Sequence, residues 1–155
     1  MVAEESLLTV EDVNQRLPLV RTIVKDIMEL HRDITFRKER LSAIRERHPV
    51  SGGDDSIYEQ EVQQMEAELS GDEDRLDGFG LELQQVGGTL TNPVLGMVDF
   101  PGDIDGEKIQ ICWQSGETEV RYWHSGECGK SVRVSLYHEL NSGGFSQEID
   151  LHQDA

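Results

Sequence analysis

The chain has 155 residues and a formal net charge of −17, from 31 acidic and 14 basic side chains, and 36% of its residues are hydrophobic. A surface this negative repels phosphate backbones and anionic lipids, which argues against binding to nucleic acid or to a membrane surface. No apolar run approaches the ~20 residues that cross a bilayer, and the acidic start is unlike a signal peptide. We expect a cytoplasmic protein with one domain over residues 1–155 and with reduced thiols at Cys112 and Cys128.

The first predicted element is a long helix that ends near Arg47. Thr9 followed by Asp12 forms a capping box at its start, and Leu8 and Val13 flank the box as a hydrophobic staple. Pro18 removes one amide donor, so it predicts either a kink or a short helix followed by a second one. Beyond it, apolar residues recur at three- and four-residue steps: Val20, Ile23, Ile27, Leu30, Ile34, Leu41 and Ile44.

A polar loop over residues 48–55 leads to a second helix, which begins with a capping box at Ser56. Its apolar stripe runs through Tyr58, Val62, Met65, Leu69, Leu76, Phe79 and Leu83. Glycines weaken its last turns, so its end falls anywhere from Gly78 to Val86, and residues 81–83 are helix or strand.

Two long amphipathic helices joined by a short loop predict an antiparallel hairpin over residues 8–86. Its seam is polar in places, at His31 or Arg37 and at Asp72. Hairpins of this kind often bury a remaining apolar face against a second copy, which predicts a homodimer through the helices.

From residue 94 the hydrophobic period changes to two, which predicts an antiparallel β-meander over residues 94–151 after a connector at 87–93. Turns are expected at Asp105-Gly106, Ser115-Gly116, 126–129 and 142–144, with a last strand over 145–151. The hairpin is the partner available to cover the sheet. The fold class is therefore α+β, with a helical hairpin packed on a small antiparallel meander.

Several motifs together resemble the bacterial proteins grouped as domain of unknown function 2203 (DUF2203). They are the opening Leu8 to Asn14 with Leu17-Pro18-Leu19-Val20, then Gly96-Met97-Val98-Asp99-Phe100-Pro101, Ile111-Cys112-Trp113, Gly116-Glu117 and Tyr122-Trp123-His124. The resemblance covers both ends of the chain and implies no activity, cofactor or catalytic residue.

One departure leaves two candidates for the histidine of this pattern. In the family pattern Trp-His is followed by Glu-Leu and Gly-Phe, whereas here Tyr137-His138-Glu139-Leu140 with Gly144-Phe145 matches that ending separately. Either residues 125–136 form an extra hairpin or the second match is accidental. The motif position belongs to His124 or to His138.

The residues with metal or acid/base chemistry are candidates for a site. Glu117, His124, His138 and Glu139 are the candidate metal ligands, since imidazole and carboxylate bind zinc, manganese or ferrous iron. A turn at 126–129 places His138 opposite Glu117 and ~20 Å from His124, which favours two separate clusters. The candidate ligand-binding residues are Asp99, Trp113, Glu117, Trp123 and His124.

A purely structural interpretation competes with these sites. Aromatic strand residues pack, and buried histidines find a neighbouring oxygen. Asp99 before Phe100-Pro101 is typical of a turn, and Cys112 of a buried inert thiol. We therefore favour a non-enzymatic interaction or small-ligand-binding module whose aromatic residues line a groove between sheet and hairpin. The alternative is a metal-dependent, hydrolase-like enzyme using Glu117 with His124 or His138, with a divalent metal as the possible cofactor.

Overall fold

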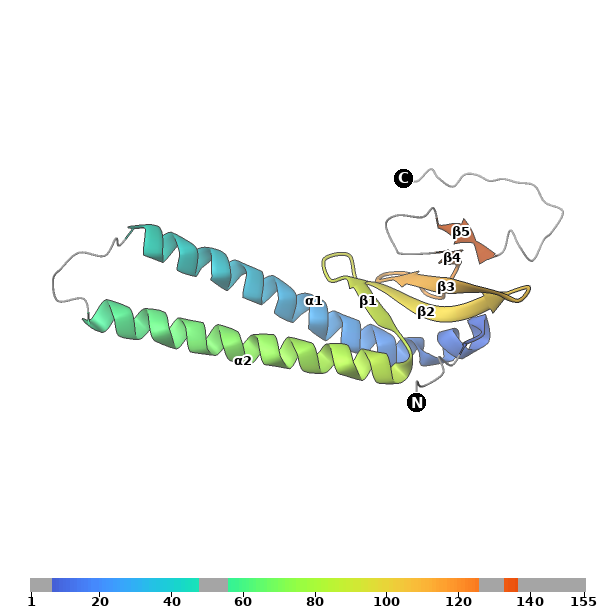
Figure 1. The fold of residues 1–155 in the computed structure, drawn as a ribbon, viewed down its shortest axis with the longest axis horizontal. Coiled ribbons are helices and arrows are strands. Elements are labelled where there is room, and N and C mark those ends of the chain that lie inside the picture. Colours follow the sequence, from blue (N-terminus) through green and yellow to red (C-terminus); the bar gives the residue numbers. More distant parts are fainter. Residues whose placement is uncertain (1–6, 48–55, 126–132, 137–155) are drawn as a thin grey trace.

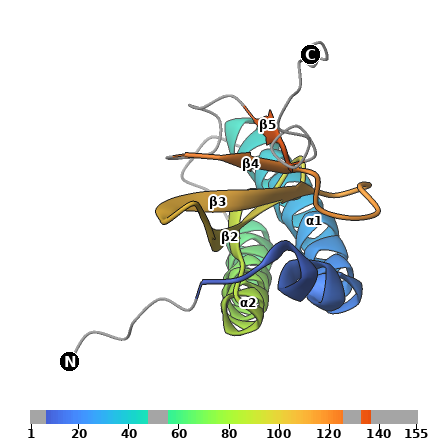
Figure 2. The same ribbon diagram turned by 90° about the vertical axis from the view of Figure 1, so that its right-hand side faces the viewer.

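The computed structural model describes residues 7–47, 56–125 and 133–136, which form a helical hairpin and one antiparallel sheet. The elements are α1 (Val10–Arg47), α2 (Ser56–Val86), β1 (Thr89–Asn92), β2 (Met97–Ile104), β3 (Glu107–Gln114), β4 (Tyr122–His124) and β5 (Val134–Ser135). The strands lie in chain order across the sheet. Figures 1 and 2 show the two layers, with the sheet over one end of the hairpin and the other end extending well past it. The predicted α+β class is confirmed.

Helix α1 starts at the predicted capping box. The amide of Thr9 donates to Asp12 Oδ2 and the amide of Asp12 donates to Thr9 Oγ1, both at 3.0 Å. Leu8 and Val13, the two staple residues, are buried in the main core. The cap therefore fixes where the chain turns under the sheet, and the amide of Leu8 donates to the carbonyl of Pro101 at 2.8 Å.

The capping box should make stability depend on pH through Asp12. Hydrogen bonds from the backbone and hydroxyl of Thr9 lower the pKa of the Asp12 carboxyl below its ordinary 3.8. A lowered pKa stabilises the fold above pH 3.8, and this stabilisation is lost as pH falls through the folded-state pKa. Asp12→Asn is therefore expected to lower the melting temperature at neutral pH but not in strong acid. Equal melting curves at neutral pH would contradict the cap's role.

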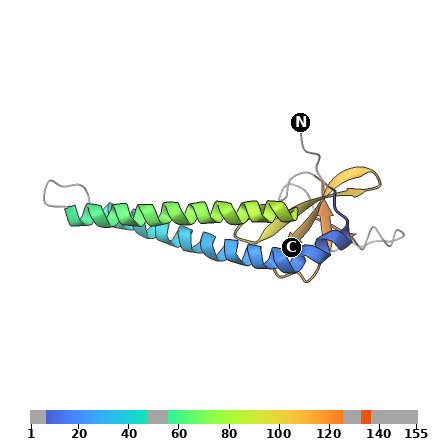
Figure 3. The same cartoon turned by 90° about the horizontal axis from the view of Figure 1, so that it is seen from below.

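Pro18 lies inside one continuous helix rather than between two. The helix changes direction within its first turns, shown in dark blue in Figure 3, which agrees with the predicted kink. Past the bend, six of the seven stripe residues are buried, and Ile44 is half-buried.

Helix α2 continues through residues 81–83 to Val86, which settles the open C-terminal boundary. At the polar part of the seam, Arg37 forms an ion pair with Asp72. Of the two predicted positions on α1, His31 and Arg37, the second is therefore the one that pairs. Outside it, Lys38 Nζ lies 2.6 Å from Glu73 Oε2, and Arg45 pairs with Glu66. Exposed pairs of this kind add little stability each, and they hold the two helices in register.

Residues 89–92, predicted to be connector, instead form strand β1. Thr89 lies opposite Asp99 and Leu90 opposite Val98, and a register shift follows before Asn92. The sheet therefore begins at residue 89, not 94. The turn at Asp105-Gly106 is confirmed, with φ of 55° and 85° at the two residues. The later predicted turns at 126–129 and 142–144, and the strand at 145–151, lie outside the described residues.

The hydrophobic core has two parts. The larger lies between the sheet and the first half of α1 and includes Leu17, Val98, Phe100, Ile111 and Trp113. The smaller lies between the two helices in the part that extends past the sheet, with only four buried members: Leu30, Ile34, Leu41 and Leu69. Within the described residues, neither helix has an apolar segment that could span a membrane.

Candidate metal centre

Three polar side chains gather on the face of the sheet that points away from the helices. Val98, Phe100, Ile111 and Trp113 face the hairpin, so the residues that alternate with them face the other way. Asp99 on β2 lies directly opposite Cys112 on β3. His124 on β4 is two residues beyond Tyr122, the direct partner of Cys112, and so shares their face.

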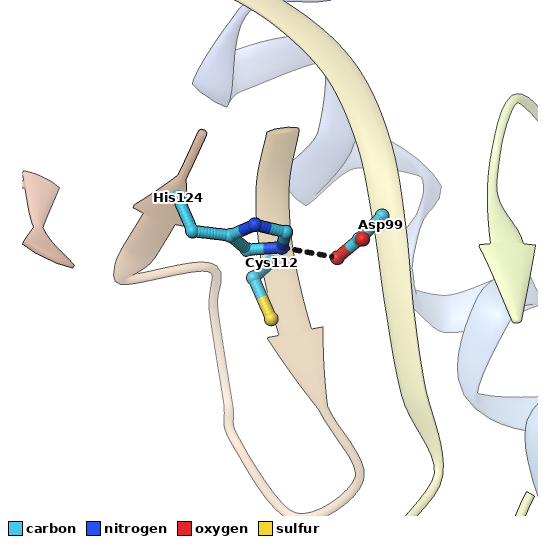
Figure 4. A group of neighbouring side chains, drawn as sticks. All are labelled: Asp99, Cys112 and His124. Carbon is cyan, nitrogen blue, oxygen red and sulfur yellow. Dashed lines mark hydrogen bonds and ion pairs between the residues drawn. The ribbon is translucent and has the colours of Figure 1, made fainter. Parts of the chain in front are cut away.

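The three side chains form one buried cluster. His124 Nε2 lies 3.0 Å from Asp99 Oδ1, and one donor atom each from Asp99, Cys112 and His124 lies within 4.8 Å of the others. In Figure 4 the imidazole extends over Cys112 toward the Asp99 carboxylate. The exposed fractions are 6% for Asp99, 0% for Cys112 and 1% for His124.

The hydrogen bonds in this cluster are incomplete. With its proton on Nε2, His124 donates to Asp99, and the lone pair of Nδ1 then has no hydrogen-bond partner in the described structure. A buried polar atom without a partner destabilises the fold by about 1–3 kcal/mol.

Arg133 borders the cluster at the start of the last described segment. Its Nη2 donates to the Cys112 carbonyl at 3.3 Å and to both Glu117 oxygens at 3.2 Å, and its guanidinium lies 4.3 Å from the centre of the Tyr122 ring. Burial would lower the pKa of Arg133, but Cys112 and Glu117 outweigh it and raise the pKa. A fixed positive charge therefore sits beside the cysteine.

The donor set is the one that zinc prefers. Zinc in proteins binds imidazole nitrogen, thiolate sulfur and carboxylate oxygen in a tetrahedron, at ~2.0–2.3 Å. Ligand atoms at those bond lengths lie about 3.5 Å from one another. Atoms already within 4.8 Å need to move by only about 1 Å to reach that geometry.

The structure brings two of the predicted ligand-binding residues, Asp99 and His124, into one cluster and leaves the others outside it. Glu117 is bound by Arg133 and accepts a hydrogen bond from the amide of Gln114 at 3.0 Å. Trp113 is 1% exposed within the core, so it does not line an open groove. Trp123 is half-buried and packs against the same core.

The predicted partners His138 and Glu139 lie outside the described residues. The pairing that is described puts Trp123 opposite Val134 and Tyr122 opposite Ser135. That register differs by two residues from the one predicted from the sequence, and the pairing of His138 itself lies outside the described residues.

Two interpretations drawn from the sequence need correction. Asp99 does not form a turn, because it lies within β2 with its carboxylate buried against His124. Cys112 is buried as predicted, but it adjoins two ionisable groups and was missed as a site member. The strand alternation carried the signal, since Cys112 alternates with the core residues Ile111 and Trp113.

The fold and site define a helical-hairpin protein with a buried Asp-Cys-His cluster on its sheet. The chain belongs to the family described as "Uncharacterized conserved protein (DUF2203)", whose model matches residues 6–136. His124 falls within the matched residues and His138 beyond them. Neither the curated proteins nor the solved structures gave a match.

Proposed function

We propose that this protein binds one divalent transition-metal ion, with Zn²⁺ as the first candidate, through Asp99, Cys112 and His124. The supporting observation is that three donor atoms of the zinc type lie within 4.8 Å of one another in a buried site.

A non-catalytic role suits this site better than hydrolysis. Catalytic zinc keeps one coordination position open to water and substrate, whereas structural zinc is enclosed. Three protein ligands leave a fourth position on zinc, but all three ligand residues are at most 6% exposed, so that position would not be open to substrate. The metal would therefore hold β2, β3 and β4 together, and the protein would act as a binding module. A metal-dependent enzyme using Glu117 with His124 or His138 remains the alternative.

Arg133 would lie outside the coordination sphere of the metal. Its guanidinium donates to the carbonyl of Cys112 and to Glu117, so it would hold the backbone of the cysteine in place. A cytoplasmic location would keep the Cys112 thiol reduced and able to bind the ion, and we propose that location too.

Metal analysis tests the proposal. Protein purified without chelator or affinity metal is expected to contain about one equivalent of zinc, measured by elemental analysis. Cobalt substitution should produce a thiolate-to-cobalt absorption band that is absent from Cys112→Ser. Protein with no stoichiometric metal, and with no cobalt band after metal-free refolding, would overturn the proposal.

We also propose that the protein is a homodimer through its helices and does not bind nucleic acid. The charge of −17 supports the second part, and the thin core of the extended hairpin supports the first. Light scattering at micromolar concentration is expected to give twice the mass of the chain. A monomer would refute the dimer without affecting the metal site.

A further inference from the structure

An apolar groove lies in the corner between α1 and the β1–β2 turn. Its volume is about 340 Å³, and it is lined by Met28, His31, Arg32, Thr35, Phe36 and Glu39 of α1 with Pro93 and Val94. Phe36 is 63% exposed and Val94 67% exposed. Two large apolar side chains on the two walls of one groove make a surface suited to an apolar partner.

The groove lies where the hairpin starts to extend past the sheet, and charge is unevenly divided there. Residues 31–47 of α1 carry six basic and three acidic side chains, and residues 56–77 of α2 carry eight acidic and one basic. Only three cations of this part of α1 form ion pairs with α2 in the described structure: Arg37, Lys38 and Arg45. The basic helix therefore complements an acidic helix beyond its own partner.

The first turn of α2, at the end of the hairpin away from the sheet, carries an exposed apolar side chain. Ile57, in the first turn of α2, is 70% exposed, and Val62 and Met65 further along are only partly buried. The exposed isoleucine at the start of α2 suits the apolar groove, and the carboxylates of α2 complement the basic side chains of α1.

We infer that the groove receives the first turn of α2 of a second copy, with Ile57 of one chain docked beside Phe36 and Val94 of the other. The inference rests on the proposed homodimer and specifies its surface. In a two-fold arrangement with the hairpins antiparallel, the first turn of each α2 reaches the groove of the other chain. That arrangement sets basic α1 against acidic α2, whereas α1 on α1 would place cations together.

Four single variants of the full-length protein test the docking by analytical ultracentrifugation. Phe36→Asp and Ile57→Asp place a charge on the two sides of the contact, and each is expected to weaken dimerisation at least tenfold. Leu19→Asp and Leu81→Asp are the controls, since these leucines are 54% and 59% exposed on the same helices near the sheet end. The controls should dimerise like the unmodified protein. Circular dichroism checks that all four fold.

A protein that is monomeric throughout would overturn both the dimer and the docking. A dimer that survives Phe36→Asp would overturn the docking alone. Dissociation by Phe36→Asp but not by Ile57→Asp would show that another segment occupies the groove, and would equally overturn the inference.

Discussion

Adding Zn²⁺ to the metal-free protein is expected to raise its melting temperature by about 10 °C. A ligand that binds only the folded state stabilises it by about 4 kcal/mol when its free concentration is a thousandfold above Kd. In a domain of this size, 1 kcal/mol shifts the melting temperature by about 2–4 °C. Differential scanning calorimetry with zinc held by a chelating buffer measures the shift. It should disappear in acid, because protons compete for the same donor atoms.

Variants separate the metal centre from the neighbouring carboxylate. Cys112→Ser, His124→Asn and Asp99→Asn each remove or weaken one ligand, so each should reduce the zinc-induced shift. Glu117→Gln is the control, because its carboxylate is bound to Arg133 outside the three-residue cluster. A shift that survives all three changes but is lost in Glu117→Gln would mean that the metal is held elsewhere.

The second large effect is expected from Leu17→Ala, which should destabilise the fold by about 2–5 kcal/mol. Leu17 is 1% exposed and packs in the main core between α1 and the sheet, so its loss leaves a cavity. Leu19→Ala is the matched control two residues along the same helix, where the side chain is 54% exposed. Its effect should stay within about 0.5 kcal/mol.

Urea unfolding of both variants at one zinc concentration measures the difference. Similar midpoints for Leu17→Ala and Leu19→Ala would contradict the packing of α1 under the sheet. Because Leu17 packs on the helix side of the sheet and the proposed metal ligands lie on the opposite face, Leu17→Ala should still bind zinc once folded. That outcome distinguishes a weakened core from a damaged site.

The helical part of the fold could be predicted from the sequence because its capping boxes and its apolar periodicity both indicate helix. The capping box at Thr9 and the apolar stripe of α1 are properties of neighbouring residues, and a hairpin needs no long-range information. The polar contact in the seam could also be predicted from local periodicity. Arg37 and Asp72 both fall on apolar stripes, so pairing the stripes pairs the charges.

Strand β1 escaped prediction because four residues contain too few repeats to show a period. Asp99 was misread because Pro101 follows it closely, and proline normally interrupts a central strand. The topology explains the exception. Strand β1 starts at Thr89, opposite Asp99, so beyond Asp99 β2 is paired only on its other edge, with β3. Pro101 sits at this open edge, where its missing amide goes unneeded and its carbonyl accepts from Leu8.

The site could be predicted only in part, because its three residues come from three different strands. Alternation assigns a face to Cys112 and His124, but the register that brings Asp99 opposite Cys112 depends on the turn at Asp105-Gly106. The pair Asp99 and His124 is joined across the intervening strand β3, and no spacing in the chain marks such a contact. The sequence identified Asp99 and His124 as candidates, but neither Cys112 nor the group that the three residues form.

The bent first half of α1 has a consequence for synthesis on the ribosome. Its apolar stripe through Leu17 is covered by strands that follow Val86, so the hairpin can be complete while this stripe still lacks its cover. During that interval the nascent chain exposes a row of aliphatic side chains to chaperones. Strands β2 and β3 can cover the row only after residue 114 has left the exit tunnel.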